Sequence, residues 1–392
     1  MLNLMRLLRS RMARPFREQQ MAGIIPLGNA MATNEIRPLT GLRGIASVLV
    51  LLYHVVLYDA YYTGPVPTLL RRSGYLGVDV FFVLSGFVMS LSYGRSFSGG
   101  ITPSNYGMFM SRRMARIYPL YFVITTIAFL HALLFHHAAS LFSFCNYIAN
   151  AAMVQTWGLG FVSISADTWS LSTEFFVYIF FPALVLLVFS VRPVYAWVVL
   201  LASAALLVRV GASGLGVRGQ LDVVSAASVF PVMRCVAGFC LGMLCYKIAQ
   251  LPAMRKPASS RLILPVLLVV FLCVLVWSHC DLLAYCFFPL IVLALYFESP
   301  GAKALFANKL IYHLGVISYS IYLVHPWCIA AAQRLGQTMG QRRCAAAHLV
   351  TLSLSCLLTW ICAFLLYRFV EVPGRVLVQK TLLRSSNHAA TG

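Results

Sequence analysis

The sequence predicts an all-α fold: a polytopic membrane helix bundle of about ten transmembrane helices with one additional re-entrant or interfacial helix. Composition is the first indication, because 60% of the 392 residues are hydrophobic and only 10% are charged. Globular domains carry nearer a quarter of charged residues. The second is that apolar runs of helical length recur along the chain, and the third is that basic residues gather between them, as expected of topology signals.

The expected spans are apolar runs of helical length with few charges. They are 41–59, 75–93, 117–136, 169–190, 194–212, 229–248, 262–279, 282–298, 310–332 and 346–369. A shorter run, 144–157, is ambiguous by length, and loop charges decide it. If the N-terminus is cytoplasmic and this run does not cross, 22 of the 30 Lys and Arg residues face the cytoplasm, whereas a crossing leaves 17 there. The positive-inside rule therefore favours ten spans, both termini in the cytoplasm, and a re-entrant or surface helix at 144–157.

Around this membrane part the chain has two short flanks. Residues 1–35 form a basic leader, expected to be cytoplasmic and poorly ordered, without the apolar core and cleavage site of a signal peptide. Residues 36–373 form the membrane domain, and 374–392 form a cytoplasmic tail. The excess of 30 basic over 10 acidic residues lies mostly in the loops and leader, so membrane lipid is an expected partner and nucleic acid is not.

Arg43 and His54 lie in the first span, separated by ten uncharged residues. On a helix eleven residues turn through about 1100° and rise about 16.5 Å, so the two side chains share one face at different depths. Ionisable groups inside a span are costly and usually functional. The pair therefore indicates an anion site at one depth and proton chemistry at another.

Three further polar residues are placed by the topology near the depth of His54, toward the outer side: Asp79, Glu174 and His325. Two imidazoles and two carboxylates at one depth suit general acid–base chemistry. Structural interpretations stay open beside this one. The histidines could form packing hydrogen bonds between helices, Asp79 could be an interfacial residue, and Glu174 could favour its helix N-terminus.

Basic and small residues mark the opposite, cytoplasmic side. Arg113 and Arg116 precede the third span, where the positive-inside rule alone could explain them, but a bidentate guanidinium also suits phosphate. Ser85 and Gly86 follow two phenylalanines in the second span, so they permit either close helix packing or a narrow lane for a thin ligand chain. Glycine-rich phosphate loops and metal-spaced Cys/His clusters are not found, and no metal site is expected.

Taken together, these segments resemble the acyltransferase-3 family of integral membrane acyltransferases, which includes bacterial O-antigen and exopolysaccharide O-acetylases. The resemblance covers residues 37–373. It rests on five segments in order: Arg43 and His54 with ten residues between them, Phe81-Phe82-x-x-Ser85-Gly86, Arg113-x-x-Arg116, Trp169-Ser170-Leu171-x-x-Glu174, and Ser318-Tyr319-Ser320-Ile321-Tyr322-Leu323-x-His325-Pro326.

The resemblance implies an enzyme of the bacterial inner membrane that moves an acyl group, typically acetyl from cytoplasmic acetyl-CoA, to a glycan hydroxyl at the outer face. The acceptor could be an exopolysaccharide such as cellulose, an O-antigen or a glycolipid, and a polysaccharide synthase or export complex is a candidate partner. The SGNH-hydrolase-like domain of some relatives is not found in this chain.

For the residues, the same resemblance implies roles in two groups. Catalysis is expected of His54 with Arg43, His325 assisting, and Glu174 or Asp79 orienting an imidazole. Binding of the coenzyme A phosphates is expected of Arg43, Arg113 and Arg116, and binding of the rest of the donor of Ser85 and Gly86.

A transporter or exporter of a glycan or lipid intermediate, without acyl-transfer chemistry, is the alternative function. Buried charged residues in a ten-span bundle also mark translocation paths. Against it, the sequence shows neither internal symmetry nor an inverted pair of broken helices.

Overall fold

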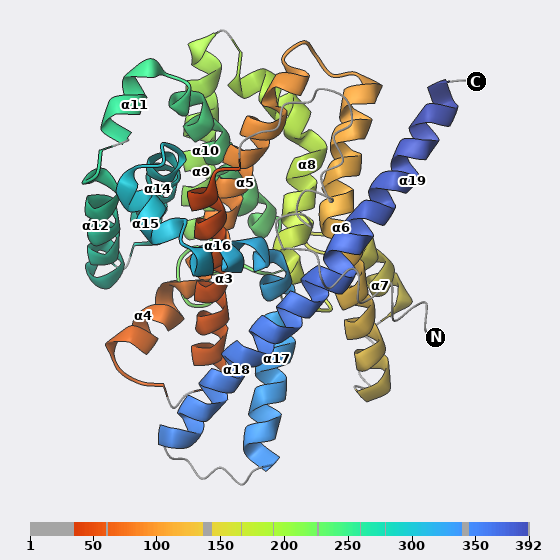
Figure 1. The fold of residues 1–392 in the computed structure, drawn as a ribbon, viewed down its shortest axis with the longest axis vertical. Helices are drawn as coiled ribbons and strands as arrows, with labels where there is room; N and C mark the ends of the chain where they lie inside the picture. Colours follow the sequence, from red (N-terminus) through yellow and green to blue (C-terminus); the bar gives the residue numbers. More distant parts are fainter. Residues whose placement is uncertain are drawn as a thin grey trace.

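The computed structural model describes residues 35–59, 62–135, 143–165, 167–190, 192–225, 227–258, 260–278, 280–338 and 345–390. In these ranges every regular element is helical, as predicted, and the helices gather into one bundle (Figure 1). The basic leader, apart from Glu35, lies outside the described residues, so its expected disorder stays a prediction.

The helices have the following bounds. They are α3 (Arg37–Tyr58), α4 (Pro65–Ser73), α5 (Gly77–Tyr93), α6 (Pro103–Phe135), α7 (Phe144–Ala151), α8 (Thr168–Val188), α9 (Pro193–Gly211), α10 (Phe230–Ala249), α11 (Pro252–Ala258), α12 (Ile263–Trp277), α13 (Asp281–Tyr285), α14 (Phe287–Tyr296), α15 (Pro300–Phe306), α16 (Lys309–Val316), α17 (Ser318–Thr338), α18 (Ala345–Leu366) and α19 (Val372–Ala390). Short 3₁₀ turns, Gly74–Leu76 and Gly94–Phe97, flank α5, and a π-helical turn, Tyr367–Glu371, joins α18 to α19.

Seven helical segments of the described chain are long and apolar enough to cross a membrane. Two bent pairs raise the number to nine if each is one span: α13 and α14 with α15, bent by 104°, and α16 with α17, bent by 76°. The predicted span 262–279 is the shorter apolar helix α12, of 15 residues. The multi-pass all-α class is therefore confirmed, whereas the number ten is not.

The ambiguous run 144–157 forms α7, a helix of only 8 residues. The Ser143 hydroxyl accepts a hydrogen bond from the backbone N–H of Asn146 and caps its start. At 1.5 Å per residue such a helix is about 12 Å long, well short of the hydrocarbon core of a bilayer. The structure therefore agrees with the expected surface or re-entrant helix.

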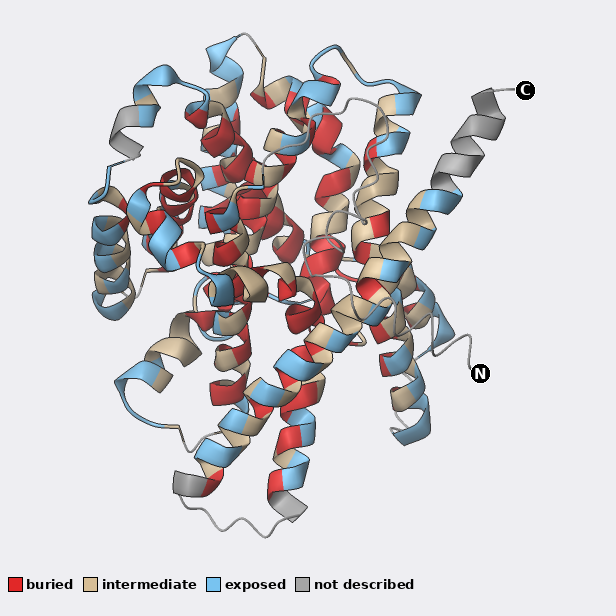
Figure 2. Cartoon of the chain, in the orientation of Figure 1, coloured by how far each residue is buried: buried red, intermediate tan, exposed pale blue. Residues whose placement is uncertain are grey.

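The core of the bundle is formed by α3, α5 and α10, whose residues are mostly buried, while α12 is largely exposed (Figure 2). Two glycines allow the close approach of these helices. A Cβ on Gly44 would lie 2.6 Å from the backbone nitrogen of Gly315 in α16, and one on Gly86 would lie 1.9 Å from the carbonyl oxygen of Phe239 in α10. Small residues thus let the backbones pack directly, as is common between membrane helices. This packing holds α3 rigidly in the centre.

The last helix does not end near 373, where the membrane domain was expected to end. Instead α18 continues through the π-helical turn into α19, which runs to Ala390 (Figure 1). Inside the turn the buried carboxylate of Glu371 accepts hydrogen bonds from the Ser320 hydroxyl at 2.9 Å and the Arg375 guanidinium at 2.9 Å. The turn therefore links the last helix to α17 through the Glu371–Ser320 hydrogen bond.

Candidate active site

A cavity of about 1020 Å³ lies among α3, α5, α6, α8, α16, α17 and α19. Its volume is that of a pocket for a ligand the size of a nucleotide cofactor. The charged residues that line it are mostly basic: Arg37, Arg43, Arg113, Arg116, Lys309 and Arg375, against Glu35 and Glu174. The cavity is therefore suited to a polyanion.

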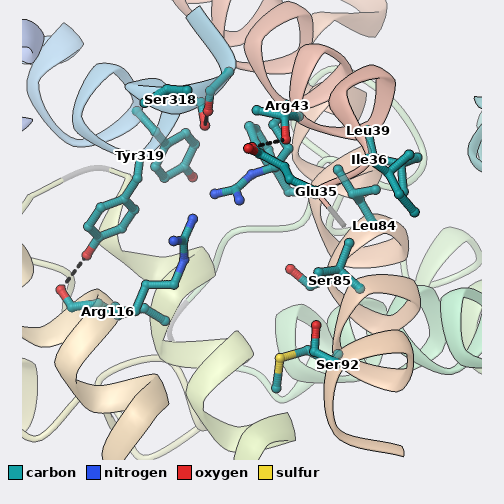
Figure 3. Close-up of a pocket in the computed structure, with 18 of the residues that line it drawn as sticks. Glu35, Ile36, Leu39, Arg43, Leu84, Ser85, Ser92, Arg116, Ser318 and Tyr319 are labelled. Atoms are coloured by element: carbon teal, nitrogen blue, oxygen red, sulfur yellow. Dashed lines mark hydrogen bonds between the residues drawn. The ribbon is translucent and has the colours of Figure 1, made fainter. Parts of the chain in front are cut away.

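Arg43 and Arg116 point into this cavity from α3 and α6, and their guanidinium groups converge there (Figure 3). Neither makes a hydrogen bond or an ion pair with another residue in the described ranges. Arg113 is held differently, because its Nη2 donates to the Tyr93 hydroxyl at 2.7 Å and its guanidinium lies over that ring. Two guanidinium groups without a carboxylate partner form a ready site for phosphate.

Glu174 lines the same cavity rather than contacting an imidazole. Its Oε1 accepts hydrogen bonds from the Ser85 hydroxyl and the Tyr178 hydroxyl, both at 2.6 Å. These two charge-assisted hydrogen bonds fix the position of the carboxylate at the cavity wall, and it forms no ion pair with Arg43 or Arg116 in the described ranges.

His54 and His325 meet in a separate cluster, which does not line the cavity. His325 Nε2 lies 3.1 Å from His54 Nδ1, and Asp167, at the N-cap of α8, joins them. The Asp167 carboxylate lies 3.2 Å from His325 Nε2 and 3.7 Å from His54 Nε2. Its Oδ2 is buried and makes no hydrogen bond within the described structure, so these contacts become ion pairs only when an imidazole is protonated. The chain thus brings two imidazoles and one carboxylate together, as predicted, but with a different carboxylate.

The tautomers of both imidazoles can be assigned from their contacts. His325 Nδ1 lies 2.8 Å from the carbonyl oxygen of Tyr322, and His54 Nδ1 lies 2.9 Å from that of Val50. Carbonyls only accept, so both Nδ1 atoms carry protons when the rings are neutral. His54 Nδ1–H is then shared between Val50 and His325 Nε2. The lone pair of His54 is left on Nε2, where a base is needed to deprotonate a hydroxyl.

Comparison with known proteins identifies the family of the chain. The model of the acyltransferase-3 family, described as an acyltransferase domain, matches residues 37–368. The chain belongs to this acyltransferase family. Acyltransferase MdmB of Streptomyces mycarofaciens is 28% identical over 369 residues, which cover 86% of this chain and 90% of MdmB. Protein 2 in picA locus of Rhizobium radiobacter is 42% identical over 84 residues, 21% of this chain and 38% of that protein. No solved structure matches the chain significantly.

Two residues expected to serve the acyltransferase chemistry have other contacts. Asp79 forms a bidentate ion pair with Arg234 of α10, with Oδ1 and Nε 2.7 Å apart and both side chains fully buried. The Arg234 guanidinium lies 5.4 Å from the ring centres of both Tyr75 and Trp169. Asp79 therefore contacts no imidazole, and its partner makes it a link between α5 and α10. The expectation that Asp79 or Glu174 orients a histidine is wrong for the contacts in this structure.

Gly86 is the other expected site residue whose contacts differ from the expected ones. It does not line the cavity, and its Cα hydrogens face the backbone of Phe239. The close packing of α5 on α10 occupies that face, so the structure shows a packing role for Gly86, and its donor-binding role stays a prediction. Ser85, Phe81 and Phe82 do line the cavity, which agrees with the predicted lane for a thin ligand chain.

Asp167 is the site residue that sequence reasoning missed. It immediately precedes Thr168, the first residue of α8, so it falls outside the apolar run from which intramembrane polar groups were taken. One signal was available. Asp167 precedes Glu174 by seven residues, which is about two helical turns, so a helix extended to residue 167 places both carboxylates on one face.

A loop between α9 and α10 contacts Tyr53, the residue whose ring packs against His54. The Tyr53 hydroxyl lies 3.4 Å from Asp222 Oδ2 in this loop, and the Tyr53 ring packs edge-on against His54 at 4.8 Å between centroids. Burial raises the pKa of Asp222, while Arg234 and Arg218 act in the opposite direction. The loop therefore holds the residue beside His54 in place through a buried polar contact.

The same three residues could also coordinate a cation. His54, Asp167 and His325 place one potential ligand atom each within 4.8 Å of one another. Both imidazoles are oriented through Nδ1 by backbone carbonyls, which is common for metal-ligating histidines and equally common for histidine bases. Since a metal would occupy the nitrogen that a base needs, the two roles exclude each other at His54 Nε2. The absence of a metal stays a prediction.

Proposed function

We propose that this acyltransferase takes an acyl group, with acetyl expected, from cytoplasmic acyl-CoA and transfers it to a hydroxyl of an extracytoplasmic glycan at the bacterial inner membrane. The observation that carries the proposal is the hydrogen-bond chain from the Tyr322 carbonyl through His325 to His54, which leaves His54 Nε2 as a free base. Membership of the acyltransferase-3 family supports it independently.

The donor site in this proposal is the basic cavity. Coenzyme A carries its phosphates at one end and the thioester at the other, joined by a thin flexible arm. Arg43 and Arg116 suit the phosphates because their guanidinium groups converge without a partner (Figure 3). Phe81 and Phe82 offer an apolar wall for the arm. The thioester then lies toward the histidine cluster.

In the reaction, His54 Nε2 takes the proton of the acceptor hydroxyl as its oxygen attacks the thioester carbon. The carbonyl electron pair moves to oxygen, then returns as the carbon–sulfur bond breaks. The departing thiolate takes the proton from His54, giving an ester and coenzyme A. Asp167 stabilises the transient imidazolium, and His325 holds His54 in the required tautomer, the role of the aspartate in a catalytic triad.

The acceptor in this proposal approaches from a side other than the donor cavity. The His54 side chain is 16% exposed, yet it does not line the cavity. Tyr58, one turn further along α3, is 52% exposed, and its ring centroid is 6.0 Å from that of His54. A separate route suits transfer between two compartments, because donor and acceptor then never share an entrance.

One structural feature favours the alternative, a transporter. The structure contains two bent helix pairs, which the sequence did not indicate. Discontinuous helices often surround translocation sites. Membership of the acyltransferase family favours acyl transfer over transport.

Inverted membrane vesicles with labelled acetyl-CoA outside test the proposal. We expect the wild type to leave label on the glycan fraction. His54→Ala should lower the initial rate by about 10²–10⁴-fold, the usual value of general-base catalysis. His131→Ala, which removes a histidine of α6 that belongs to neither the cavity lining nor the cluster, should match the wild type. Normal labelling by His54→Ala would contradict the assignment of the base, and absence of label in the wild type with normal glycan export would favour the transporter. Metal analysis of the purified protein completes the test: a stoichiometric ion lost in His54→Ala would replace the base with a metal site.

A further inference from the structure

Only a thin layer of side chains separates the donor cavity from the histidine cluster in the described structure. Tyr322 and Ser170 both line the cavity, and both also contact the cluster. The Tyr322 hydroxyl lies 3.2 Å from the carbonyl oxygen of Asp167, and so does the Ser170 hydroxyl. The Tyr322 ring lies 6.0 Å from the His325 ring, between centroids. A thioester in the cavity that meets an acceptor activated by His54 must therefore lie against these two hydroxyls.

The two hydroxyls share their protons in a way that leaves one available. Ser170 Oγ and Tyr322 Oη are 2.7 Å apart, and either can donate to the other. If Ser170 donates to the Asp167 carbonyl, Tyr322 donates to Ser170. The Tyr322 hydroxyl can then turn to a new acceptor while the Asp167 carbonyl keeps its hydrogen bond. The molecule loses only a neutral hydrogen bond between hydroxyls, which is weaker than a hydrogen bond to a developing negative charge.

The ring of Tyr322 is held in place, so its hydroxyl is preorganised. The residue is 6% exposed, its ring packs against Phe81 at 6.0 Å, and its backbone carbonyl receives the Nδ1–H of His325. A donor fixed in advance, in a site with little water, is the arrangement that stabilises a tetrahedral oxyanion most effectively. The same residue would thus orient the histidine pair through its backbone and face the thioester through its side chain.

We propose that Tyr322 is a catalytic residue, the hydrogen-bond donor to the thioester oxygen as it becomes an oxyanion. This inference rests on the proposed function. When the acceptor oxygen attacks, the carbonyl electron pair moves onto oxygen, and the Tyr322 O–H turns from Ser170 to donate to it. When the carbon–sulfur bond breaks the carbonyl forms again, and Tyr322 returns to Ser170 with its proton. Tyr322 therefore gains and loses no proton over the cycle.

The test uses the full chain in inverted vesicles with labelled acetyl-CoA and their own glycan. Tyr322→Phe keeps the ring and removes the hydroxyl. We expect kcat to fall by about 10²–10³-fold, as for loss of one oxyanion donor, with the KM for acetyl-CoA within about threefold of the wild type. The matched control is Tyr121→Phe, which removes a fully buried tyrosine hydroxyl of α6 outside the cavity and should keep wild-type kinetics.

A second variant guards against a general effect on packing. Incorporation of 3-fluorotyrosine at position 322 keeps a hydroxyl that is a better donor, so kcat should recover to within about tenfold of the wild type. The proposal is overturned if Tyr322→Phe keeps kcat within threefold, if the change appears in KM instead, or if the fluorinated residue is as defective as phenylalanine. A wild-type protein that transfers no label would overturn the proposed function itself, so the two failures are distinguishable.

Discussion

Replacement of Asp167 by asparagine is the sharpest test of how the cluster works. Asparagine has nearly the same shape, so Asp167→Asn removes the charge and little else. In the structure the carboxylate lies 3.7 Å from His54 Nε2 and 3.2 Å from His325 Nε2, and the side chain of Asp167 is 5% exposed. Its charge is therefore well placed to stabilise the imidazolium that forms when His54 takes a proton.

The magnitude follows from the distance. Two unit charges about 4 Å apart interact by about 4 kcal/mol at an effective dielectric constant of about 20. Since about 1.4 kcal/mol corresponds to a tenfold change in rate, loss of the whole interaction lowers kcat by roughly 10³-fold. The asparagine dipole retains a part of it, so this value is an upper bound. The KM for acyl-CoA should not change, because Asp167 does not line the donor cavity.

The assay is the initial rate of label transfer from acetyl-CoA to vesicle glycan, measured over a range of acetyl-CoA concentrations. Asp281→Asn serves as control, because it neutralises another buried aspartate, in α13, which contacts Tyr75 and the backbone of Leu221 but no histidine. A kcat of Asp167→Asn within threefold of the wild type would refute the reasoning, as would a fall of the same size in the control. Either result would mean that the imidazolium is not stabilised by Asp167.

Three further predictions concern binding and stability. Arg116→Gln should raise the KM for acyl-CoA by about tenfold or more with little change in kcat, because the substitution removes one of the two unpaired guanidinium groups of the anion site. An unchanged KM would mean that Arg116 sets only topology. Gly86→Ala should lower the midpoint of thermal unfolding in detergent, because its Cβ would lie 1.9 Å from the Phe239 carbonyl oxygen; a normal midpoint with a raised KM would support the donor-binding role. Arg234→Met should destabilise by about 3–5 kcal/mol, because Asp79 stays buried without a partner, and adding Asp79→Leu should recover most of that loss in the same unfolding assay.

Sequence reasoning found the polar groups whose cost in an apolar span demands a reason. Arg43, His54 and His325 were recognised in this way, and all three lie in the cavity or the cluster. Helix geometry also predicted correctly that Arg43 and His54 lie at different depths on α3. These inferences need only the period of one helix and the composition around it, which the sequence contains.

The sequence could not decide which carboxylate serves the histidines. Asp79 lies one turn inside α5 and looks available, but the choice depends on how α5 is rotated against α10, where Arg234 takes the carboxylate. Asp167 lies outside the apolar run, and only the fold brings the start of α8 next to α3 and α17. Rotation and contact between helices are properties of tertiary packing, which a single sequence with no pairing information does not specify.

Helix geometry explains why the cavity and the histidine cluster lie at different heights along the bundle. His54 follows Arg43 by eleven residues on α3, a rise of about 16.5 Å, and Glu174 follows Asp167 by seven residues on α8, a rise of about 10.5 Å. Both spacings return to nearly the same helix face. Each helix therefore presents one residue to the cavity and one to the cluster, and α8 runs in the opposite direction to α3.

Helix α17 also carries one residue of the cavity and one of the cluster, but with a shorter separation along the chain. On α17, Tyr322 lines the cavity and His325, one turn later, lies in the cluster, so the boundary between the two levels falls within a single turn. A ligand that binds phosphate at the level of Arg43 and reacts beside His54 must reach across this offset with a thin arm. Coenzyme A has that shape, and a compact phosphorylated donor does not. The spacing of these residues along α3, α8 and α17 is therefore the spacing that the proposed acyl-CoA donor requires.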